Sequence, residues 1–537
     1  MTEGVAKPIE TLLLEARAGL ETHSHSCDAK LASTPDDQLG HAFFAAALEN
    51  RDRIALTTPT GSYSYADLMT SALDVRCRLM NSPSFIPGSR VLLLLPNSPE
   101  YLAAFYGTLL ADGVAVPLAP RMERHQFESI RQSTGAMHVI TQSRIAQSWT
   151  EALNTTQIAN ALPGERAAAG SNDRAVTDGL AAILFTGGSS GTPKGVMLSH
   201  QNLIKNARSI QQYLSIRSDD RPLCVLPFYH AFGNSILQSH LLAGSHLIIG
   251  GNATFPETLI EAIVQHRATS LSAVPDLFRY LLERSSLGTA KLPSLSYMAV
   301  AGGALPHELG QQVVARIAPA RFFVMYGQTE ATARLAYVPP DRLDVLGSGC
   351  IGRPVPGVEL EVVDESGIPV VAGAIGEIRA RGPNIMLGYW RDPTLTSEII
   401  REGWLYTGDL GTVDENGWIY HRGRCNALIK IAGYRIHPSD VENFVMRELP
   451  IQQAVLVPFE LAGLGTRLAL YVRRDPDARD LATIEILARC RAELPRHMVP
   501  DLIQLVDEFP LNDAMKIDRP RLMAIAAEAA TERRKTA

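Results

Sequence analysis

The sequence lacks the features that mark secreted, membrane-spanning or nucleic-acid-binding proteins. Acidic residues outnumber basic ones, 56 to 50, and the net charge of −6 argues against a nucleic-acid partner held by a broad basic surface. Cysteine is scarce, with six in 537 residues and no CxxC pair, which predicts free thiols in a reducing compartment. The leucine run at 92–95 is too short to span a bilayer, and residues 1–20 lack the basic start and apolar core of a secretory signal. We therefore expect a cytoplasmic protein with no nucleic-acid partner and no membrane span.

Hydrophobic residues make up 46% of the chain and, from about residue 40, fall into alternating strand-like and helix-like runs. "SRVLLLLP" (89–96) indicates a buried strand, "SPEYLAAFYGTLLADG" (98–113) a helix that ends at glycine, and "VAVPLAP" (114–120) another strand. Because strands that alternate with helices usually form a parallel sheet covered by those helices, the fold class predicted is α/β. The large N-terminal domain should hold parallel or mixed sheets covered by helices.

The pattern changes after about residue 347, where alternating segments at 357–370 and 376–389 predict a β-rich subdomain. The segment from residue 423 predicts a small, mobile α+β C-terminal domain, with a helix opened by a capping box of Ser439 and Glu442. We expect three parts, which are an N-terminal extension at 1–38, a large domain at 39–423 and a small domain at 424–537. "HSHSC" in the extension is better explained as a polar tail than as a metal cluster, because no second ligand group stands at a usual spacing.

The segment "ILFTGGSSGTPKGVMLSH" at 183–200 is suited to bind a phosphate, because glycines allow close backbone approach and hydroxyls donate hydrogen bonds. It is not a P-loop, since no Ser or Thr follows Lys194 and the apolar flanks predict two strands rather than a strand that enters a helix. The next helix would begin only after Ser199, whose hydroxyl can cap it. We interpret the segment as a strand–loop–strand phosphate clamp; a glycine-rich hairpin without a ligand is the less favoured alternative.

Seven motifs in order give the chain a resemblance to the adenylate-forming superfamily, which includes acyl-CoA synthetases, peptide-synthetase adenylation domains and beetle luciferases. The motifs are "TGGSSGTPKG" (186–195), "LPFYHAFG" (226–233), "AGGALP" (301–306), "MYGQTEAT" (325–332), "YTGDLG" (406–411), "GRCNALIKIAGYRI" (423–436) and "PLNDAMKIDR" (510–519). The resemblance covers about residue 40 to the end. Seven ordered motifs are far more specific than any one of them.

The resemblance implies a site for ATP and Mg²⁺ and assigns roles to the matching positions. The loop from Thr186 to Lys194 would hold the β- and γ-phosphates, Glu330 would bind Mg²⁺, and Asp409 would accept hydrogen bonds from the ribose. Lys516 would bridge the substrate carboxylate and the α-phosphate. The nucleotide-binding positions implied are Thr186, Gly187, Gly188, Ser189, Ser190, Gly191, Thr192, Lys194, Gly303, Ala304, Tyr326 (against adenine), Gly327, Thr329 (at the α-phosphate), Glu330, Asp409, Arg424, Lys430 (for the thiol step) and Lys516. The catalytic positions implied are Lys516, Thr186, Glu330 and His230, and the substrate pocket would include His230, Phe232, Val300, Ala301, Gly302 and Thr332, with the segment 332–334.

Each of these residues alone has an ordinary structural explanation. Asp409 could be a turn aspartate, Lys516 a solvated lysine, Glu330 an acid at a helix start, and His230 a packed loop histidine. Their place in the ordered set favours the functional interpretation.

The function implied is that of an ATP-dependent ligase, which converts a small-molecule carboxylic acid to acyl-AMP with release of pyrophosphate. The acyl group would then pass to the thiol of CoA, or to the phosphopantetheine of an acyl carrier protein. An amino-acid-activating domain is less favoured, because residues 227–240 contain no acid to pair with a substrate amine. A non-catalytic nucleotide-binding relative stays open, because Asn426 and Met515 stand where the family usually has an acidic residue and a glycine.

Overall fold

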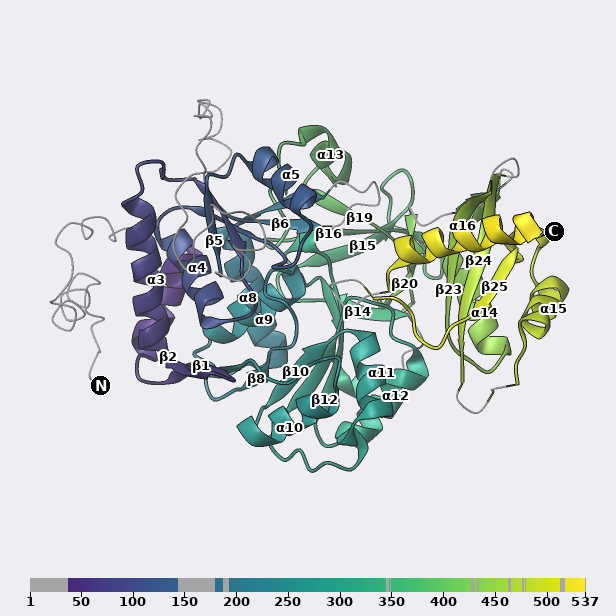
Figure 1. Cartoon of the computed structure of the whole chain (residues 1–537), viewed down its shortest axis with the longest axis horizontal. Helices are drawn as coiled ribbons and strands as arrows, with labels where there is room; N and C mark the ends of the chain where they lie inside the picture. Colours follow the sequence, from purple (N-terminus) through teal and green to yellow (C-terminus); the bar gives the residue numbers. More distant parts are fainter. Residues whose placement is uncertain are drawn as a thin grey trace.

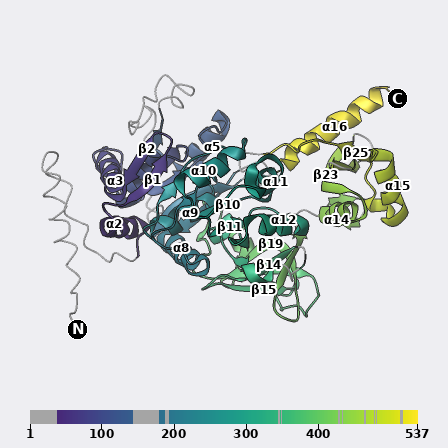
Figure 2. The same cartoon turned by 90° about the horizontal axis from the view of Figure 1, so that it is seen from below.

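The computed structural model shows a large N-terminal lobe and a small C-terminal lobe, residues 429–536, at one end of the long axis (Figure 1). The view at right angles places the small lobe at the same end (Figure 2). The residues described are 37–142, 179–186, 193–343, 347, 349–425, 429–431, 434–461, 465–475, 478, 480–511 and 517–536. Within these ranges, helices of the length and apolar character needed to cross a membrane are absent. The predicted α/β class is confirmed.

The longer sheet of the large lobe is parallel at its centre and antiparallel at one end. Its order is β15-β16-β19-β20-β14-β13-β12-β11-β10-β8-β9-β1-β2, with β18 beside β19. The bounds are β1 Ile54–Thr58, β2 Gly61–Ser64, β8 Pro222–Leu223, β9 Leu247–Ile248, β10 Ser270–Ala273, β11 Tyr297–Val300, β12 Arg321–Tyr326, β13 Ala336–Val338, β14 Cys350–Pro354, β15 Glu359–Val363, β16 Gly376–Arg381, β18 Ile400–Arg401, β19 Trp404–Val413 and β20 Ile419–Arg424. Strands β8 to β12 are parallel, whereas β13 to β20 pair antiparallel and form the expected β-rich part.

The second sheet has the order β17-β7-β6-β4-β3-β5. Its strands are β3 Arg90–Leu94, β4 Val114–Pro117, β5 His138–Thr141, β6 Leu180–Thr186, β7 Lys194–Ser199 and β17 Gly388–Tyr389. Strands β6 and β7 are antiparallel partners, with Thr186 opposite Lys194. The next helix begins after Ser199, whose hydroxyl accepts a hydrogen bond from the backbone N–H of Asn202. The predicted strands and helix cap around the glycine loop are therefore confirmed, while residues 187–192 of the loop lie outside the described residues.

Helices cover the two sheets of the large lobe. They are α2 Leu39–Glu49, α3 Tyr65–Met80, α4 Pro99–Leu110, α5 Arg124–Thr134, α8 His200–Leu214, α9 Ala231–Leu241, α10 Glu257–His266, α11 Pro275–Arg284, α12 His307–Ile317 and α13 Pro393–Ile399. Helices α4 and α9 are buried along almost their whole length. In α4 apolar or small residues occupy nearly every face, whereas α9 also buries the polar side chains of Asn234, Gln238 and His240. The side chains of α9 therefore lie in the interior rather than at the surface.

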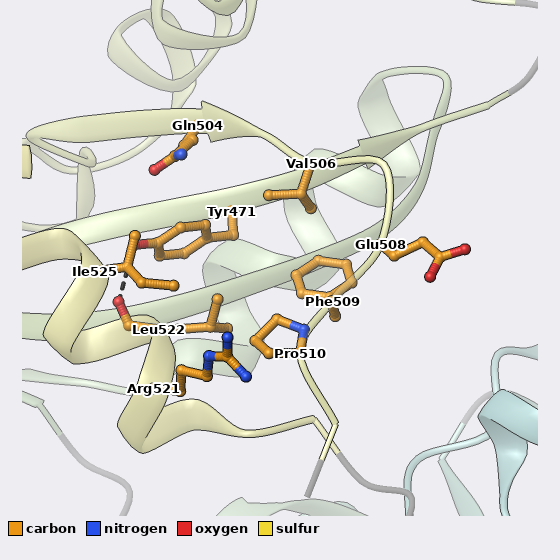
Figure 3. A pocket seen from close by; sticks show the side chains of 9 residues that line it. All are labelled: Tyr471, Gln504, Val506, Glu508, Phe509, Pro510, Arg521, Leu522 and Ile525. Carbon is orange, nitrogen blue, oxygen red and sulfur yellow. Dashed lines mark hydrogen bonds between the residues drawn. The ribbon is translucent and has the colours of Figure 1, made fainter.

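The small lobe has hydrophobic clusters of its own, built from residues 429–530. It contains β21 Ile429–Ile431 paired with β22 Tyr434–Ile436, a sheet of β23 Ile451–Leu461, β24 Gly465–Arg474 and β25 Leu502–Leu505, and the helices α14 Pro438–Glu448, α15 Thr483–Glu493 and α16 Arg519–Thr536. A hollow of about 380 Å³ lies under α16, where the Tyr471 hydroxyl donates to the Leu522 carbonyl (Figure 3). None of the predicted site residues lines this hollow.

The capping box predicted at Ser439 and Glu442 is wrong. A helix capped by Ser439 would begin at Asp440, but helix α14 begins two residues earlier, at Pro438, and His437 before it makes no side-chain cap. Proline at the first helical position has its φ already set for a helix, so the helix can begin there without the box. Glu442 instead accepts hydrogen bonds from the Leu456 N–H at 2.8 Å and from Arg519 at 2.9 Å, and so joins α14 to β23 and α16.

Helix α11 of the large lobe carries polar contacts to the small lobe. Glu283 accepts from Gln452 and from Arg473, both at 2.8 Å, and Arg284 pairs with Glu508. Contacts of this polar kind resemble those of interfaces that open and close, rather than those of a shared apolar core.

Candidate active site

A buried carboxylate, Asp409, joins three of the motifs. It is 3% exposed on β19. The Tyr326 hydroxyl, at the end of β12, donates to Oδ2 at 2.6 Å, and Arg424 Nε of β20 lies 3.0 Å from Oδ1 as an ion pair. His421 Nε2 lies 3.6 Å from the same Oδ1. The β19–β20 hairpin creates this group, because its register places Asp409 opposite Arg424.

The electrostatics keep Asp409 ionised. Burial by itself raises its pKa, but the interaction with His421, 3.6 Å away, and the positive charge of Arg424 outweigh burial and hold the pKa below its usual value. Burial, followed by the negative charge of Asp409, raises the pKa of Tyr326 well above its usual value. At neutral pH the pair is therefore a carboxylate acceptor with a neutral phenol beside it, which suits binding of hydroxyl donors.

A second group forms around Glu330, in the short helix η2 (Thr329–Ala331) after β12. The Tyr389 hydroxyl donates to Glu330 Oε1 at 2.7 Å, and Lys194 Nζ lies 5.5 Å from the centre of the Tyr389 ring. Strand β17 pairs with β7, with Tyr389 opposite Val196, so this tyrosine comes to stand beside the start of β7. The glycine-loop motif and the "MYGQTEAT" motif thus meet through Tyr389. Thr186 is near the same place, since its hydroxyl donates to the Lys194 carbonyl at 3.5 Å.

The chain folds back tightly between these groups. A Cβ at Gly327 would lie 1.8 Å from the carbonyl oxygen of Ala333, so only glycine fits there. Thr332 and Ala333 hold positive φ values of 59° and 121°, which side chains rarely adopt. The Thr332 hydroxyl donates to the Asn384 carbonyl at 2.6 Å, so it is engaged with the backbone rather than directed to a substrate in this structure.

The loop between β8 and α9 is fixed by the side chain of Asn97, which lies between β3 and α4. The Asn97 amide donates to the Leu226 carbonyl and accepts from the Phe228 N–H, both at 2.8 Å. A Cβ at Gly233 would lie 2.0 Å from the Pro227 carbonyl oxygen, so only glycine fits at this position in the first turn of α9. A hollow of about 370 Å³ opens here, lined by Pro96, Asn97, Ala119, Pro120, Arg121, Val225, Pro227 and Tyr229.

His230 and Phe232 come from this loop and the first turn of α9. His230 precedes the helix and its ring lies 4.5 Å from that of Tyr229, which lines the hollow. The Phe232 ring lies 4.1 Å from the guanidinium carbon of Arg334. Phe232 therefore connects the "LPFYHAFG" motif to the end of the segment that follows Glu330.

The "AGGALP" motif follows β11, whose last residue, Val300, pairs with Ala273 of β10 and Val324 of β12. Ala301 is buried and Gly302 has a φ of +87°. A Cβ at Gly303 would make only ordinary contact with Pro275, so sterics alone do not require glycine there. Since β11 and β12 are parallel, residues 300–304 and 326–330 lie at the same edge of the sheet, where ligands bind in open α/β sheets.

Part of the predicted site lies outside the described residues. Those positions are Gly187, Gly188, Ser189, Ser190, Gly191, Thr192 and Lys516. Lys430 is described only as backbone of β21. Ala304 lies in the loop after β11 and Thr329 begins the short helix η2, both at the sheet edge, and Arg424 is two-thirds exposed beside Asp409.

Sequence reasoning missed Tyr389 and His421, which touch Glu330 and Asp409. Neither stands in a motif with a spacing that points to chemistry, and only the β17–β7 and β19–β20 pairings bring them in. In the described ranges, three or more His, Cys, Asp or Glu side chains do not gather into a metal cluster. The five cysteines found there are free thiols, as their spacing predicts.

Comparison with known proteins agrees with these motifs. A family model described as AMP-binding enzyme matches residues 43–390, well over half of the chain. The long-chain-fatty-acid–CoA ligase of Escherichia coli O157:H7 is 29% identical over 487 residues, which cover 81% of this chain and 85% of that ligase. The feruloyl-CoA synthase of an Amycolatopsis species is 29% identical over 435 residues, covering 80% and 87%.

Among solved structures, ATP-bound MatB from Rhodopseudomonas palustris superposes with a TM-score of 0.75 at 25% identity, covering 92% of this chain and 100% of that one. The motifs, the site geometry and the match over residues 43–390 agree. The chain belongs to the AMP-binding enzyme family, within the adenylate-forming superfamily that its motifs indicate.

Proposed function

We propose that this protein is an ATP-dependent, AMP-forming acid–thiol ligase that makes an acyl-CoA. One observation carries the proposal: the Asp409 and Glu330 groups, drawn from motifs far apart in the sequence, lie on one loop–strand system at the carboxyl edge of the parallel strands. The names of relatives such as the fatty-acid–CoA ligase and feruloyl-CoA synthase support CoA as the acceptor. Phosphopantetheine on a carrier protein is the alternative acceptor, and cytoplasmic location is part of the proposal.

The nucleotide would lie with its ribose on Asp409. The ionised carboxylate accepts from the ribose hydroxyls, Tyr326 packs against adenine, and Arg424 supplies positive charge. Thr186 and Lys194, with the glycine loop between them, would hold the β- and γ-phosphates. The residues act by positioning ATP and by neutralising charge along the line of phosphoryl transfer.

Glu330 fits Mg²⁺. Magnesium is usually held by one or two carboxylates together with substrate phosphates and water, and Tyr389 fixes the Glu330 carboxylate beside Lys194. When bound, the ion would neutralise phosphate charge. Tyr389 would hold the Glu330 carboxylate in place through its hydroxyl.

In the first half-reaction an oxygen of the substrate carboxylate attacks the α-phosphorus, and the bond from that phosphorus to pyrophosphate breaks. Lys516 would hold the two anionic reactants together. In the second half-reaction the thiol sulfur attacks the acyl carbon and AMP leaves as the bond to the adenylate oxygen breaks. Lys430 and the strand β21 would serve this step.

The small lobe would have to turn between the steps, because Lys430 and Lys516 belong to the same lobe and serve the same acyl–phosphate centre. We infer a domain boundary near residue 424, with residues 1–38 as an extension and a pivot at 424–426. The contacts of Glu283 with Gln452 and Arg473 would break in that motion.

A panel assay tests the function. Purified protein with ATP, Mg²⁺ and CoA should release AMP and pyrophosphate in the presence of an acid, and should form an acyl-CoA detectable by mass spectrometry. Fatty acids, hydroxycinnamic acids, dicarboxylic acids and the proteinogenic amino acids form the panel. Acid-dependent pyrophosphate exchange without thioester formation would contradict CoA as acceptor, and faster exchange with an amino acid than with every simple acid would favour the amino-acid-activating alternative.

A further inference from the structure

Arg334 is a buried cation without an acidic partner. It is 2% exposed and ranks among the largest fully buried side chains. In the part of the chain that the structure describes, it forms no ion pair, and its Nε has no hydrogen-bond partner. Since a guanidinium stays protonated in proteins, the charge is present and must be stabilised by its surroundings.

The groups around Arg334 are aromatic and neutral. Its guanidinium lies 4.1 Å from the centre of the Phe232 ring, and Tyr213 and Tyr297 also act on it. Burial lowers its pKa, and the two tyrosines only partly offset that effect. Asp220 acts on the neighbouring His240 and Tyr297, but its own oxygens accept from the Arg217 N–H and the Thr269 hydroxyl. The protein supplies a cation–π contact and phenol groups but no carboxylate, which is a costly arrangement for a buried charge.

The chain holds Arg334 in this place. The tight fold from Gly327 to Ala333 and the hydrogen bond from the Asn384 amide to the Arg334 carbonyl, at 2.8 Å, fix its backbone. Phe232, under the guanidinium, lies two residues after His230, at the start of the buried helix α9. The Arg334 guanidinium is therefore held against Phe232, a residue of the predicted acyl pocket.

By contrast, the two other buried arginines of the described large lobe, Arg76 and Arg279, have partners for their side chains. Arg76 of α3 is 6% exposed, and its Nε donates to the Leu110 carbonyl at 3.0 Å. Arg279 of α11 is 6% exposed, lies 3.0 Å from Asp276 and donates to Gln453. The chain thus satisfies a buried arginine where its role is to join elements. It leaves the Nε of Arg334 without a hydrogen-bond partner, and the guanidinium without an acidic partner in the described residues, beside Phe232 of the predicted acyl pocket.

We infer that the acid substrate carries a second carboxylate, at the end remote from the one that is adenylated, and that Arg334 binds it. This inference rests on the proposed ligase function and specifies its substrate class as dicarboxylic acids. A carboxylate matches the planar fork of a guanidinium. On binding it would neutralise the Arg334 charge and accept hydrogen bonds from the guanidinium N–H groups. Phe232 and Tyr213 would flank the remote carboxylate as the walls of its pocket.

The test compares acids that differ only in the second carboxylate. Succinate, adipate, suberate and terephthalate are measured against butyrate, hexanoate, octanoate and benzoate, by ATP-dependent AMP formation with wild type, Arg334→Met, Arg334→Lys and Arg279→Met. We expect the best dicarboxylate to exceed its matched monocarboxylate in kcat/KM by about 100-fold or more, because a site built for a polar group strongly rejects an analogue without it. That ratio should fall about 100-fold in Arg334→Met, be partly kept in Arg334→Lys and be unchanged in Arg279→Met.

The outcomes separate this inference from the proposed function. Wild-type preference for the monocarboxylates would overturn the dicarboxylate inference while the ligase function stands. A dicarboxylate preference that survives in Arg334→Met would overturn the role of Arg334. If that variant does not fold, the wild-type ratio and the Arg334→Lys variant decide the question. Failure of wild type to adenylate any acid of the panel would overturn both proposals.

Discussion

The proposed site has a nucleotide side, around Asp409, and an acyl side, around Arg334. The two sides differ in how many polar partners their charged side chains have before a ligand binds. On the nucleotide side the Asp409 carboxylate already holds the Tyr326 hydroxyl and the Arg424 charge. On the acyl side the buried Arg334 faces only aromatic and neutral groups in the described chain. Under the proposed function, the nucleotide would be met by a preformed site, whereas the acyl site would leave a charge for its own substrate to satisfy. Variants on the two sides should therefore fail in different ways.

The largest effect is expected where the two sides meet, at Lys516. Its charge is needed as the carboxylate and the α-phosphate approach each other, so its loss should lower the rate more than binding. Lys516→Ala should reduce acid-dependent pyrophosphate exchange by about 100- to 1,000-fold for every acid alike, as removal of one preorganised donor does elsewhere. The variant should still convert chemically made acyl-AMP to thioester. Lys205→Ala, an exposed lysine of α8, is the matched control.

Wild-type exchange in Lys516→Ala would contradict the role given to this lysine. Exchange lost for some acids and kept for others would instead place Lys516 on the acyl side alone, which would break the comparison between the two sides.

A smaller and uniform effect is expected at Asp409. Asp409→Asn removes the ionised carboxylate that we propose as the acceptor of the ribose hydroxyls. The loss of one or two such hydrogen bonds, about 1–3 kcal/mol, corresponds to a 10- to 100-fold rise in KM for ATP. The ratio of dicarboxylate to monocarboxylate activity should stay the same, in contrast to Arg334→Met. ATP saturation curves measure the KM for ATP, and the same curves recorded with each of two matched acids give the ratio of dicarboxylate to monocarboxylate activity. Glu415→Gln, in the exposed turn after β19, is the control. A changed acid preference in Asp409→Asn would show that the two sides are coupled.

Most of the fold could be predicted from the sequence, because its determinants are local. The apolar runs at 89–96 and 114–120 became β3 and β4, and Ser199 caps α8 as expected. The capping box of α14 failed because Pro438 supplied a stronger local start and Glu442 was drawn into tertiary contacts. Local signals of similar strength compete, and only the packed structure decides between them.

Only the site residues that stand in sequence motifs could be predicted. Tyr326, Glu330 and Asp409 could be named because they stand in motifs, but their partners Tyr389 and His421 come from strand pairings that no spacing encodes. The segment 332–334 was expected in the pocket, yet the sequence could not indicate that the Arg334 charge would be buried without an acid. Burial and pairing are properties of the whole fold, so they cannot be read from one segment.

The last expected effect is on the pH dependence of stability. The interaction with His421 and the Arg424 charge, acting against burial, hold the folded-state pKa of Asp409 below the value of about 3.9 for an unfolded aspartate. A carboxyl group with a lowered folded-state pKa adds stability that is fully present above its unfolded pKa and is lost as the pH falls through its folded pKa. Asp409→Asn should therefore be less stable than wild type at pH 7, by about 1.5–3 kcal/mol for the charge-assisted hydrogen bonds lost. The difference should narrow as the pH falls below 4. Urea unfolding at pH 7, 5 and 3.5 measures this difference in the free energy of unfolding.

Arg334→Met removes a cation that has no acidic partner in the described chain. The difference in free energy of unfolding between this variant and wild type should therefore stay constant over the same pH range. A narrowing difference for Arg334→Met would reveal a carboxylate partner and would remove the contrast between the two sides of the site.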